Sequence, residues 1–248
     1  MSLYSFVIMA GGRGVRMGSE VPKPLREIDG RSMLEHSVSS VRKTGAGKIV
    51  VVAGNGEVGS MVSSLGCEIA WQREPLGTAD ALKKALPLCY SEGRVLVTCA
   101  DIPLVTAEIF NKLSAVHERE NNYLTILSAE APDASGYGRI IKAGDRVTGI
   151  VEEAEASPEE KKIRTVNSGV YCIERAGLEK FLSEIERSTV KGEYYLTDLI
   201  GILVKAGERV GETSCDWRYV RGVNTPRQLE EASELLKSIG REENAERT

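Results

Sequence analysis

Residues 8–25 read Ile-Met-Ala-Gly-Gly-Arg-Gly-Val-Arg-Met-Gly-Ser-Glu-Val-Pro-Lys-Pro-Leu, directly after the apolar run 3–8. The apolar run predicts a buried strand, and the stretch after it predicts a glycine-rich loop with basic residues. Without side chains, glycines let backbone N–H groups close around phosphate oxygens, and cationic side chains neutralise a polyphosphate. The glycines are Gly11, Gly12 and Gly14, and the basic residues are Arg13, Arg16 and Lys23. The stretch is therefore expected to bind a nucleotide and to help cleave it.

Two better-known phosphate loops do not match this pattern. A Walker A loop needs Gly-Lys-Ser/Thr at a set spacing, and a dinucleotide fingerprint needs a third glycine where Met17 stands. Glycine-rich turns after a first strand also occur merely to let a helix pack closely on a sheet, so the glycines alone leave both interpretations open. Arg16-Met17 and Pro22-Lys23 favour the nucleotide site.

Length and composition bound the class of protein. With 248 residues, the chain is expected to form one large domain or one domain with an appendage. Hydrophobic residues make up 42% and charged residues 27%, which allows a sizeable core. The net charge of −4 comes without a basic stripe, so nucleic acid is not an expected partner. The first apolar run is too short to span a bilayer and lacks the basic flank of a signal peptide, so no membrane partner is expected either.

The cysteines and histidines predict no special chemistry. The five cysteines are widely spaced and form no CxxC pair, which indicates reduced thiols and a cytoplasmic location. Both histidines, His36 and His117, fall inside helical patterns, so neither a metal cluster nor a catalytic triad is expected from them.

Short apolar runs rich in β-branched residues alternate with amphipathic stretches. The expected strands span residues 5–10, 48–53, 68–71, 94–98 and 124–129. The expected helices span residues 32–44, 58–65, 78–86, 107–119 and 226–238. This alternation predicts an α/β fold with a Rossmann-like mixed, mostly parallel sheet, helices on both faces, and ligands at the carboxyl ends of the strands.

The middle of the chain has a different character. Segments 138–142 and 146–151 predict a β-hairpin, and residues 165–173 predict another strand. We expect an antiparallel β insertion beside the parallel core, forming a lid-like half that binds a second ligand. The polar end, residues 240–248, is expected to be frayed.

The segment 71–81 predicts a strand, a turn and a helix that could contact a base. The Gln72 amide is suited to base recognition because it offers a donor and an acceptor side by side. Gly77 permits close approach of the backbone, and Thr78 is expected to cap the following helix. Taken alone, the segment is better explained as an ordinary strand, turn and capped helix, and no role is assigned to Asp80.

Asp101 is a candidate magnesium ligand. It follows the apolar strand 94–98, at the end of the strand that faces the ligand crevice in such sheets. Mg²⁺ prefers oxygen ligands and commonly takes one or two from protein, the rest coming from phosphate and water. A second oxygen is expected from Asn224, whose neutral amide adds no charge beside a triphosphate. A plain turn residue before Pro103, and an ordinary residue before a helix, are the simpler interpretations of these two positions.

Five further segments recur in one known family, in this order and at matching intervals. They are Gly-Tyr-Gly-Arg-Ile at 136–140, Val-Glu-Glu at 151–153, Asn-x-Gly at 167–169, Glu-Tyr-Tyr-Leu-Thr-Asp at 193–198 and Gly-Val-Asn at 222–224. Together with the first loop and the Gln…Leu-Gly-Thr-Ala run, they resemble the sugar-phosphate nucleotidyltransferases. The greatest resemblance is to the uridyltransferase domain of the bifunctional N-acetylglucosamine-1-phosphate enzymes, and it covers residues 5–229.

The resemblance implies a nucleotide-diphospho-sugar transferase fold and a set of site residues. It implies a nucleotidyltransferase domain over 1–227, with a nucleotide-binding half at about 1–130 and a sugar-binding half at about 131–227, and a helix and polar tail at 228–248. It implies that Arg16 and Lys23 hold the phosphates through the transition state and that Asp101 and Asn224 bind Mg²⁺. The implied uridine contacts are Ala10, Gly11, Gln72, Gly77 and Thr78, and the implied sugar contacts are Gly138, Glu152, Asn167 and Thr197.

The implied reaction joins UTP to N-acetylglucosamine 1-phosphate with release of pyrophosphate. Bifunctional members continue into a β-helix that transfers an acetyl group, and because this sequence ends after one helix, no acetyltransferase activity is expected. Ala154-Glu155 stands where the family usually has lysine and aspartate, which leaves another sugar 1-phosphate or another nucleotide as the alternative. A non-catalytic sugar-nucleotide binding module is disfavoured because Arg16, Lys23 and Asp101 are all present. Oligomeric state and regulation are not predicted.

Overall fold

The computed structural model describes residues 4–11, 21–190 and 192–246, with residues 240–246 described by their backbone only. The strands are β1 (Tyr4–Ala10), β2 (Glu27–Ile28), β3 (Arg31–Ser32), β4 (Lys48–Ala53), β5 (Glu68–Trp71), β6 (Arg94–Cys99), β7 (Leu124–Glu130), β8 (Arg139–Ala143), β9 (Arg146–Val151), β10 (Thr165–Glu174) and β11 (Val210–Ser214). The α-helices are α1 (Met33–Lys43), α2 (Gly56–Ser64), α3 (Thr78–Ala85), α4 (Ala107–Arg119), α5 (Leu178–Ser183), α6 (Asp198–Lys205) and α7 (Pro226–Glu246).

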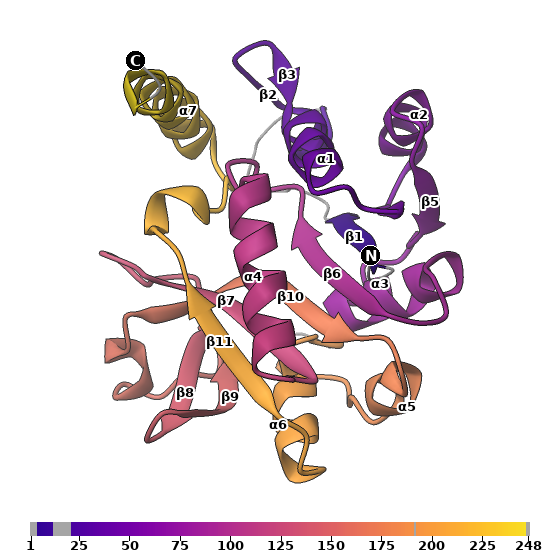
Figure 1. Ribbon diagram of the computed structural model, residues 1–248, viewed down its shortest axis with the longest axis vertical. Coiled ribbons are helices and arrows are strands. Elements are labelled where there is room, and N and C mark those ends of the chain that lie inside the picture. The colour runs from indigo at the N-terminus through magenta and orange to yellow at the C-terminus, as the bar shows by residue number, and fades with distance from the viewer. Residues whose placement is uncertain (1–3, 12–20, 191, 247–248) are drawn as a thin grey trace.

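The main sheet has the strand order β11-β7-β10-β6-β1-β4-β5, and the β8–β9 hairpin joins it through β10. β1 pairs in parallel with β4 on one side and with β6 on the other. β4 also pairs in parallel with β5, and β11 pairs in parallel with β7. The predicted mixed, mostly parallel sheet is therefore confirmed (Figure 1).

The antiparallel strand β10 does not occupy the position predicted from the sequence. β10 was expected beside the parallel core, but it lies inside the main sheet, antiparallel to β6 on one side and to β7 on the other. Both of its edges are thus hydrogen-bonded. Val170 to Ile173 are buried, which a strand at this central position requires.

Two hydrophobic layers cover the sheet. Along β1, Val7 packs with α3, α5 and α6 on one face, whereas Phe6 and Ile8 pack with α1, α2 and α4 on the other. This alternation follows from the two-residue period of a strand. Helices on both faces were predicted from the sequence, and Figure 1 shows α4 crossing in front of the sheet.

Side-chain hydrogen bonds cap the N-termini of α1 and α2. Ser32 and Glu35 form a capping box on α1, and Asn55 accepts from the Val58 N–H, 3.0 Å away, at the start of α2. These caps fix where each crossover turns back toward the sheet.

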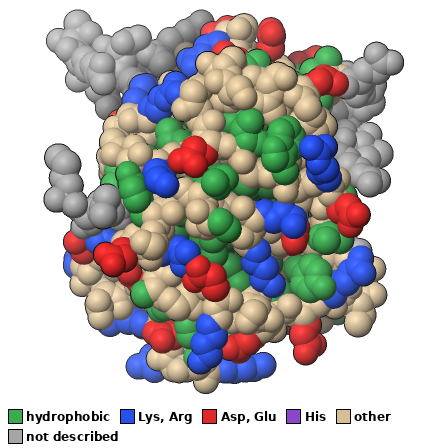
Figure 2. All heavy atoms as spheres, turned by 90° about the vertical axis from the view of Figure 1, so that its right-hand side faces the viewer, with side chains coloured by type: hydrophobic (Ala, Val, Ile, Leu, Met, Phe, Trp, Pro, Cys, Tyr) green, Lys and Arg blue, Asp and Glu red, His purple; other side chains and the backbone are tan. Residues whose placement is uncertain are grey.

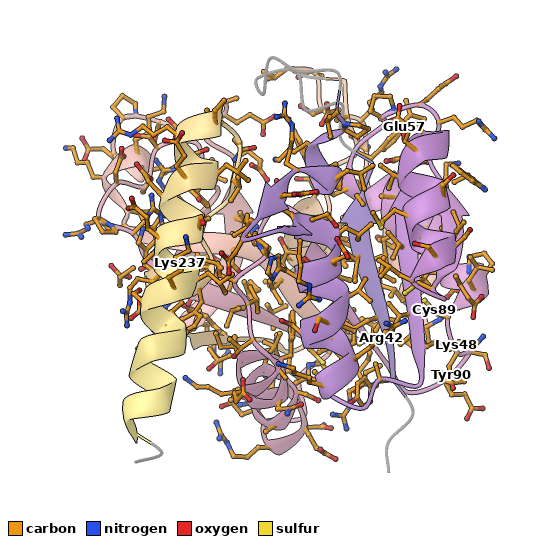
Figure 3. All side chains as sticks on the ribbon, turned by 90° about the horizontal axis from the view of Figure 1, so that it is seen from above. Arg42, Lys48, Glu57, Cys89, Tyr90 and Lys237 are labelled. Carbon is orange, nitrogen blue, oxygen red and sulfur yellow. The ribbon has the colours of Figure 1, made fainter. Side chains whose placement is uncertain are left out.

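Helix α7 lies along one side of the molecule (Figure 3). Ala232 packs with Ile28, Met33 and Val223, and the Lys237 ammonium lies 3.8 Å from the Asp29 carboxylate. The helix continues to Glu246, so the fraying expected for residues 240–248 is wrong for the described part of that segment. In the described part of the chain, no helix is both long and apolar enough to cross a membrane.

The face that carries α2, β5 and α3 mixes charges of both signs. Figure 2 shows acidic and basic side chains interspersed there. This agrees with the small net charge of −4.

Candidate nucleotide site

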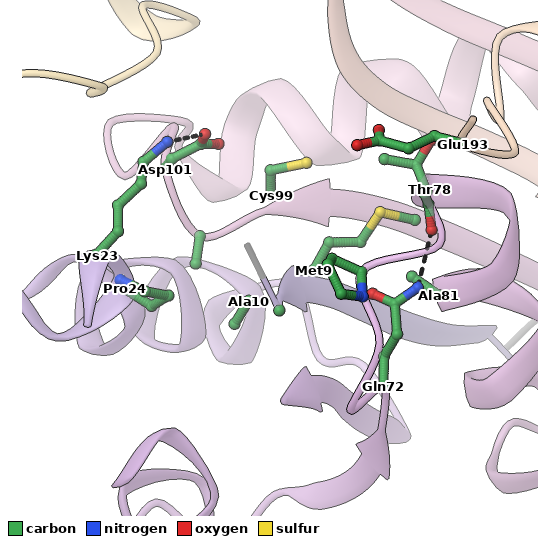
Figure 4. A pocket seen from close by; sticks show the side chains of 14 residues that line it. Met9, Ala10, Lys23, Pro24, Gln72, Thr78, Ala81, Cys99, Asp101 and Glu193 are labelled. Atoms are coloured by element: carbon green, nitrogen blue, oxygen red, sulfur yellow. Dashed lines mark hydrogen bonds and ion pairs between the residues drawn. The ribbon is translucent and has the colours of Figure 1, made fainter. Parts of the chain in front are cut away.

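A cavity of about 450 Å³ opens at the carboxyl ends of β1 and β6 (Figure 4). Its walls come from the end of β1 and the start of the glycine-rich stretch, from the segment between β5 and α3, and from the residues after β6. The lining residues are Met9, Ala10, Gly11, Lys23, Pro24, Gln72, Pro75, Gly77, Thr78, Ala81, Cys99, Ala100, Asp101 and Glu193. The sequence predicted this edge of the sheet as the ligand site, because parallel strands bring their following loops to one edge.

The glycine-rich stretch is described only in part. Gly11 lines the cavity, and a side chain there would place its Cβ 3.1 Å from Oε1 of Gln72. Gly12, Gly14 and Arg16 lie outside the described residues. The predicted roles of these three therefore stay predictions.

A lysine joins the two candidate metal ligands. Nζ of Lys23 lies 2.5 Å from Oδ2 of Asp101 (Figure 4). It also lies 2.7 Å from Oδ1 of Asn224. The lysine side chain is 12% exposed and the aspartate 34%, so the carboxylate remains accessible from the cavity. Two oxygens thus converge on one positive charge, and carboxylate and amide oxygens are the kind of ligand that a hard cation such as Mg²⁺ prefers, with phosphate and water supplying the rest. The residues present fit a magnesium ion.

Asn224 reaches Asp101 through backbone and side-chain contacts across the fold. The Val223 N–H donates to the backbone carbonyl of Asp101 at 2.8 Å, and the Gly222 N–H donates to the Tyr137 hydroxyl at 2.8 Å. Beyond Asn224, Gln228 accepts from the Asn224 N–H at 2.8 Å and so ties the segment to the first turn of α7. This tertiary frame brings together two residues that lie far apart in the sequence.

The Gln72 amide is more constrained than its sequence indicated. Nε2 donates to the Gly77 carbonyl at 2.9 Å and to Oδ2 of Asp80 at 2.8 Å. Both of its protons are therefore used inside the protein, and the expectation that the side chain offers a donor to a base is wrong. Its acceptor, Oε1, is the group that remains for a ligand. Asp80, to which no role was assigned, takes part in the site through this contact.

Gly77 and Thr78 join the two halves of the domain. Gly77 has a φ of 105°, and a Cβ there would lie 2.4 Å from the Tyr194 carbonyl oxygen. The Thr78 hydroxyl accepts from the Leu196 N–H at 2.9 Å and does not cap α3, whose N-cap is Gly77. The predicted capping role is therefore wrong, because a tertiary partner takes the hydroxyl. Both residues line the cavity, as a nucleotide contact requires.

The four predicted sugar contacts lie together, next to this junction. The Thr197 hydroxyl donates to Oε1 of Glu152 at 2.9 Å, and the Asn167 N–H donates to the Gly138 carbonyl at 2.9 Å. A Cβ on Gly138 would lie 3.7 Å from Glu152 Oε1 and from the Asn167 Cβ. Among the described residues that line the cavity, the sugar half contributes Glu193, which begins the segment 193–198 but was not predicted as a contact.

A buried arginine holds the hairpin that carries Glu152. Arg139 is 2% exposed, and its guanidinium lies 2.6 Å from Oε2 of Glu153. The Arg139 guanidinium beside it lowers the pKa of Glu153 below its usual 4.5. This pair links the Gly-Tyr-Gly-Arg-Ile segment to the Val-Glu-Glu segment. Farther along, exposed Glu155 accepts from the Ser188 hydroxyl at 2.8 Å.

Cys99 lines the cavity, and its thiol is neutral. Burial, with a smaller contribution from the nearby Asp101 carboxylate, raises the pKa of its thiol to about 12. The cysteine therefore serves as a packing residue and not as a nucleophile.

Comparisons with known proteins agree with this geometry. Residues 6–166 match the MobA-like NTP transferase domain family. The chain is 45% identical over 236 residues to the bifunctional protein GlmU of Pelotomaculum thermopropionicum, and 41% identical over 235 residues to that of Lactobacillus delbrueckii subsp. bulgaricus. Each alignment covers 93% of this chain and 51% of the relative, so the chain spans about half the length of these curated proteins.

A solved structure shows the same fold. The inositol-1-phosphate CTP transferase from T. maritima superimposes with a TM-score of 0.72 at 18% identity, over 96% of this chain and 97% of that one. The resemblance predicted from the motifs is thus confirmed. The chain belongs to the MobA-like NTP transferase domain family, whose match covers every residue that lines the cavity except Glu193.

Proposed function

We propose that this chain is a uridylyltransferase that forms UDP-N-acetylglucosamine and pyrophosphate from UTP and N-acetylglucosamine 1-phosphate. The observation that carries the proposal is the convergence of Lys23, Asp101 and Asn224 at one end of a cavity whose other end holds the Gln72 amide. A nucleotide placed with its base at Gln72 brings its phosphates toward this charged group. The identity of the relatives, which are bifunctional GlmU proteins, supports the choice of substrates.

The sugar phosphate serves as its own nucleophile. A phosphate monoester with a second pKa of about 6 is mostly dianionic at pH 7, so it can attack the α-phosphorus without a general base. Catalysis then requires two anions to be held in line and their charge to be neutralised. Lys23 supplies an ammonium at the cavity, and Arg16 is proposed from the sequence to supply a second cation.

Asp101 and Asn224 are proposed to hold Mg²⁺. When bound, the ion neutralises charge on the triphosphate. Lys23 donates hydrogen bonds to both oxygens, which keeps the two side chains aimed at one point. The Val223 and Gly222 backbone contacts hold Asn224 in that position independently of the lysine.

The sugar moiety is proposed to contact Gly138, Glu152, Asn167 and Thr197. The carboxylate of Glu152 can accept hydrogen bonds from sugar hydroxyls, and Thr197 orients it. Glu193 lines the nucleotide cavity from this half of the domain, and we expect it to lie between the two substrates.

Pyrophosphate release tests the proposal. The enzyme would be offered N-acetylglucosamine 1-phosphate with UTP, dTTP, CTP, GTP or ATP in turn, with and without Mg²⁺. The proposal predicts magnesium-dependent turnover with UTP well above that with CTP or ATP. No turnover with any nucleotide would refute the sugar phosphate, and a screen of other sugar 1-phosphates would follow.

A further inference from the structure

Two hydrogen bonds to Nε2 fix the orientation of the Gln72 amide. The side chain is 5% exposed, and its two Nε2 protons are taken by the Gly77 carbonyl and the Asp80 carboxylate. A rotated amide would direct Oε1 at these two oxygens, with no proton between them. The amide oxygen therefore faces the cavity above Gly11, opposite the bonded Nε2 (Figure 4).

Asp80 is the stronger of the two anchors. Its hydrogen bond to Nε2 involves a carboxylate and is therefore charge-assisted, unlike the bond to the neutral carbonyl. The Asp80 side chain is 16% exposed, and its other oxygen lies 3.7 Å from Nζ of Lys84, one turn later on α3. Helix α3 thus presents a fixed acceptor to the amide.

We propose that Asp80 is a positioning residue that makes Gln72 a dedicated acceptor, so that the site selects a base with a ring N–H. The inference rests on the proposed function for the identity of the reaction. Uracil carries a proton on N3 and can donate to Oε1. Cytosine has a lone pair at N3, which would face the lone pairs of Oε1. An amide free to rotate could present its donor to cytosine instead, and Asp80 removes that possibility.

The test compares UTP with CTP in the whole enzyme and in the variant Asp80→Ala. Loss of the charge-assisted bond is expected to lower the ratio of kcat/KM for UTP over CTP about tenfold. The change should arise mainly in the KM values, because Asp80 acts through Gln72, whose proposed contact is with the base and not with the reacting phosphates. The ratio for UTP over dTTP should not change, since thymine also carries a proton on N3.

Two variants separate positioning from general damage to α3. Asp80→Asn keeps a side-chain oxygen at the same place and is expected to restore most of the UTP preference. Lys84→Ala removes the other charged partner of Asp80 but leaves both bonds to Nε2, so its ratio should match that of the unaltered enzyme. Thermal unfolding of each variant checks that α3 remains folded.

A double-mutant cycle isolates the route through Gln72. In a Gln72→Ala background, Asp80→Ala should cause no further change in the UTP over CTP ratio. A further loss in that background would mean that Asp80 acts on the base by another path, and would overturn the inference.

Equilibrium binding distinguishes a failure of this inference from a failure of the proposed reaction. UTP and CTP, each with Mg²⁺, are titrated into the unaltered protein and into Asp80→Ala by calorimetry. Tighter binding of UTP that is lost in the variant supports the inference even if no pyrophosphate is released with the sugar phosphate. Equal affinities in the unaltered protein, or an unchanged ratio in a folded Asp80→Ala variant, would overturn it.

Discussion

The nucleotide side and the sugar side of this domain place their functional groups in different ways. On the nucleotide side, Ala10, Gln72 and Asp101 each lie at or just beyond the carboxyl end of a strand, and these strands run in parallel. On the sugar side, Glu152 and Asn167 belong to the antiparallel part, and they are held by hydrogen bonds to Thr197 and Gly138. The first arrangement follows from the parallel strand topology, which brings the strand ends together. The second depends on individual hydrogen bonds between neighbouring groups.

This difference indicates how each side should respond to substitution. The nucleotide side depends on a few charges and on close backbone approach, so single changes there should have large effects. The sugar side shares its contacts among several neutral and acidic groups, so single changes should have smaller effects that are confined to one substrate. The following predictions test this contrast, from the largest expected effect to the smallest.

Lys23→Ala should have the largest effect on turnover. Loss of a preorganised cation is expected to lower kcat by roughly 10²–10³-fold, by analogy with the loss of an oxyanion-hole donor. Steady-state pyrophosphate release measures it. Lys162→Ala is the matched control, because Lys162 is exposed and pairs only locally with Glu159. Near-normal turnover in Lys23→Ala would contradict the assignment of the charged end of the cavity.

Gly77→Ala should break the junction between the two sides. The positive φ and the clash with the Tyr194 backbone are expected to cost about 2–3 kcal/mol of unfolding free energy, or roughly 5–10 °C in Tm. Differential scanning calorimetry measures the change. Gly201→Ala in α6 is the matched control, since a Cβ there meets no atom within 4 Å and alanine favours a helix. Similar Tm values for the two variants would show that the junction is not tightly packed.

Glu152→Gln should affect the sugar side alone. Glutamine can still accept from Thr197 but carries no charge, so the KM for the sugar phosphate should rise about tenfold while the KM for UTP stays the same. Initial rates with each substrate varied in turn measure both constants. Glu159→Gln, on the exposed surface, serves as the control. An equal rise in both KM values would mean that the two sides are not separable in this way.

Glu153→Gln should give the smallest effect, and one that depends on pH. Arg139 holds the pKa of Glu153 below 4.5 in the folded protein, so the pair stabilises the fold above the unfolded-state pKa and loses this contribution as pH falls through the folded-state value. Because Glu153 is 35% exposed, the variant should be only about 1 kcal/mol less stable at pH 7. Urea unfolding should show this difference at pH 7 and little of it at about pH 3. A difference independent of pH would exclude the charge as its cause.

The sequence predicted the order of the elements well, because that order depends on local patterns. Alternating apolar runs and amphipathic stretches placed most of the central strands and helices, and apolar residues of period two along β1 do pack on opposite faces. β11 was missed, since Val210–Ser214 has little apolar character for a strand. The position of β10 between β6 and β7 was also missed, because strand order depends on pairing between distant segments.

The sequence predicted which side chains form the candidate site but not how they contact one another. The motifs named Gln72, Asp101 and Asn224, and the structure brings the last two to one lysine. The motifs did not indicate that Asp80 would occupy the donor of Gln72, or that the Thr78 hydroxyl would accept from Leu196. The first outcome depends on how the turn between β5 and α3 brings two side chains together, and the second on a contact between a side chain and distant backbone; a linear pattern contains neither.

By itself, the sequence determined the kinds of groups available and the strand end at which each would lie. Glycines, cations and carboxylates placed after apolar strands specify a phosphate-binding edge, because parallel strands deliver their loops to the same side. Only the tertiary structure decided which partners meet, and therefore which hydrogen-bonding groups remain for a ligand. Asn224 reaches Asp101 because the Val223 N–H bonds to the Asp101 carbonyl, and Gln72 faces the cavity with its oxygen because Gly77 and Asp80 take both of its protons. The physical reason is that a polar group buried in a folded chain must pair, and its partner is fixed by how the segments of the chain pack in three dimensions.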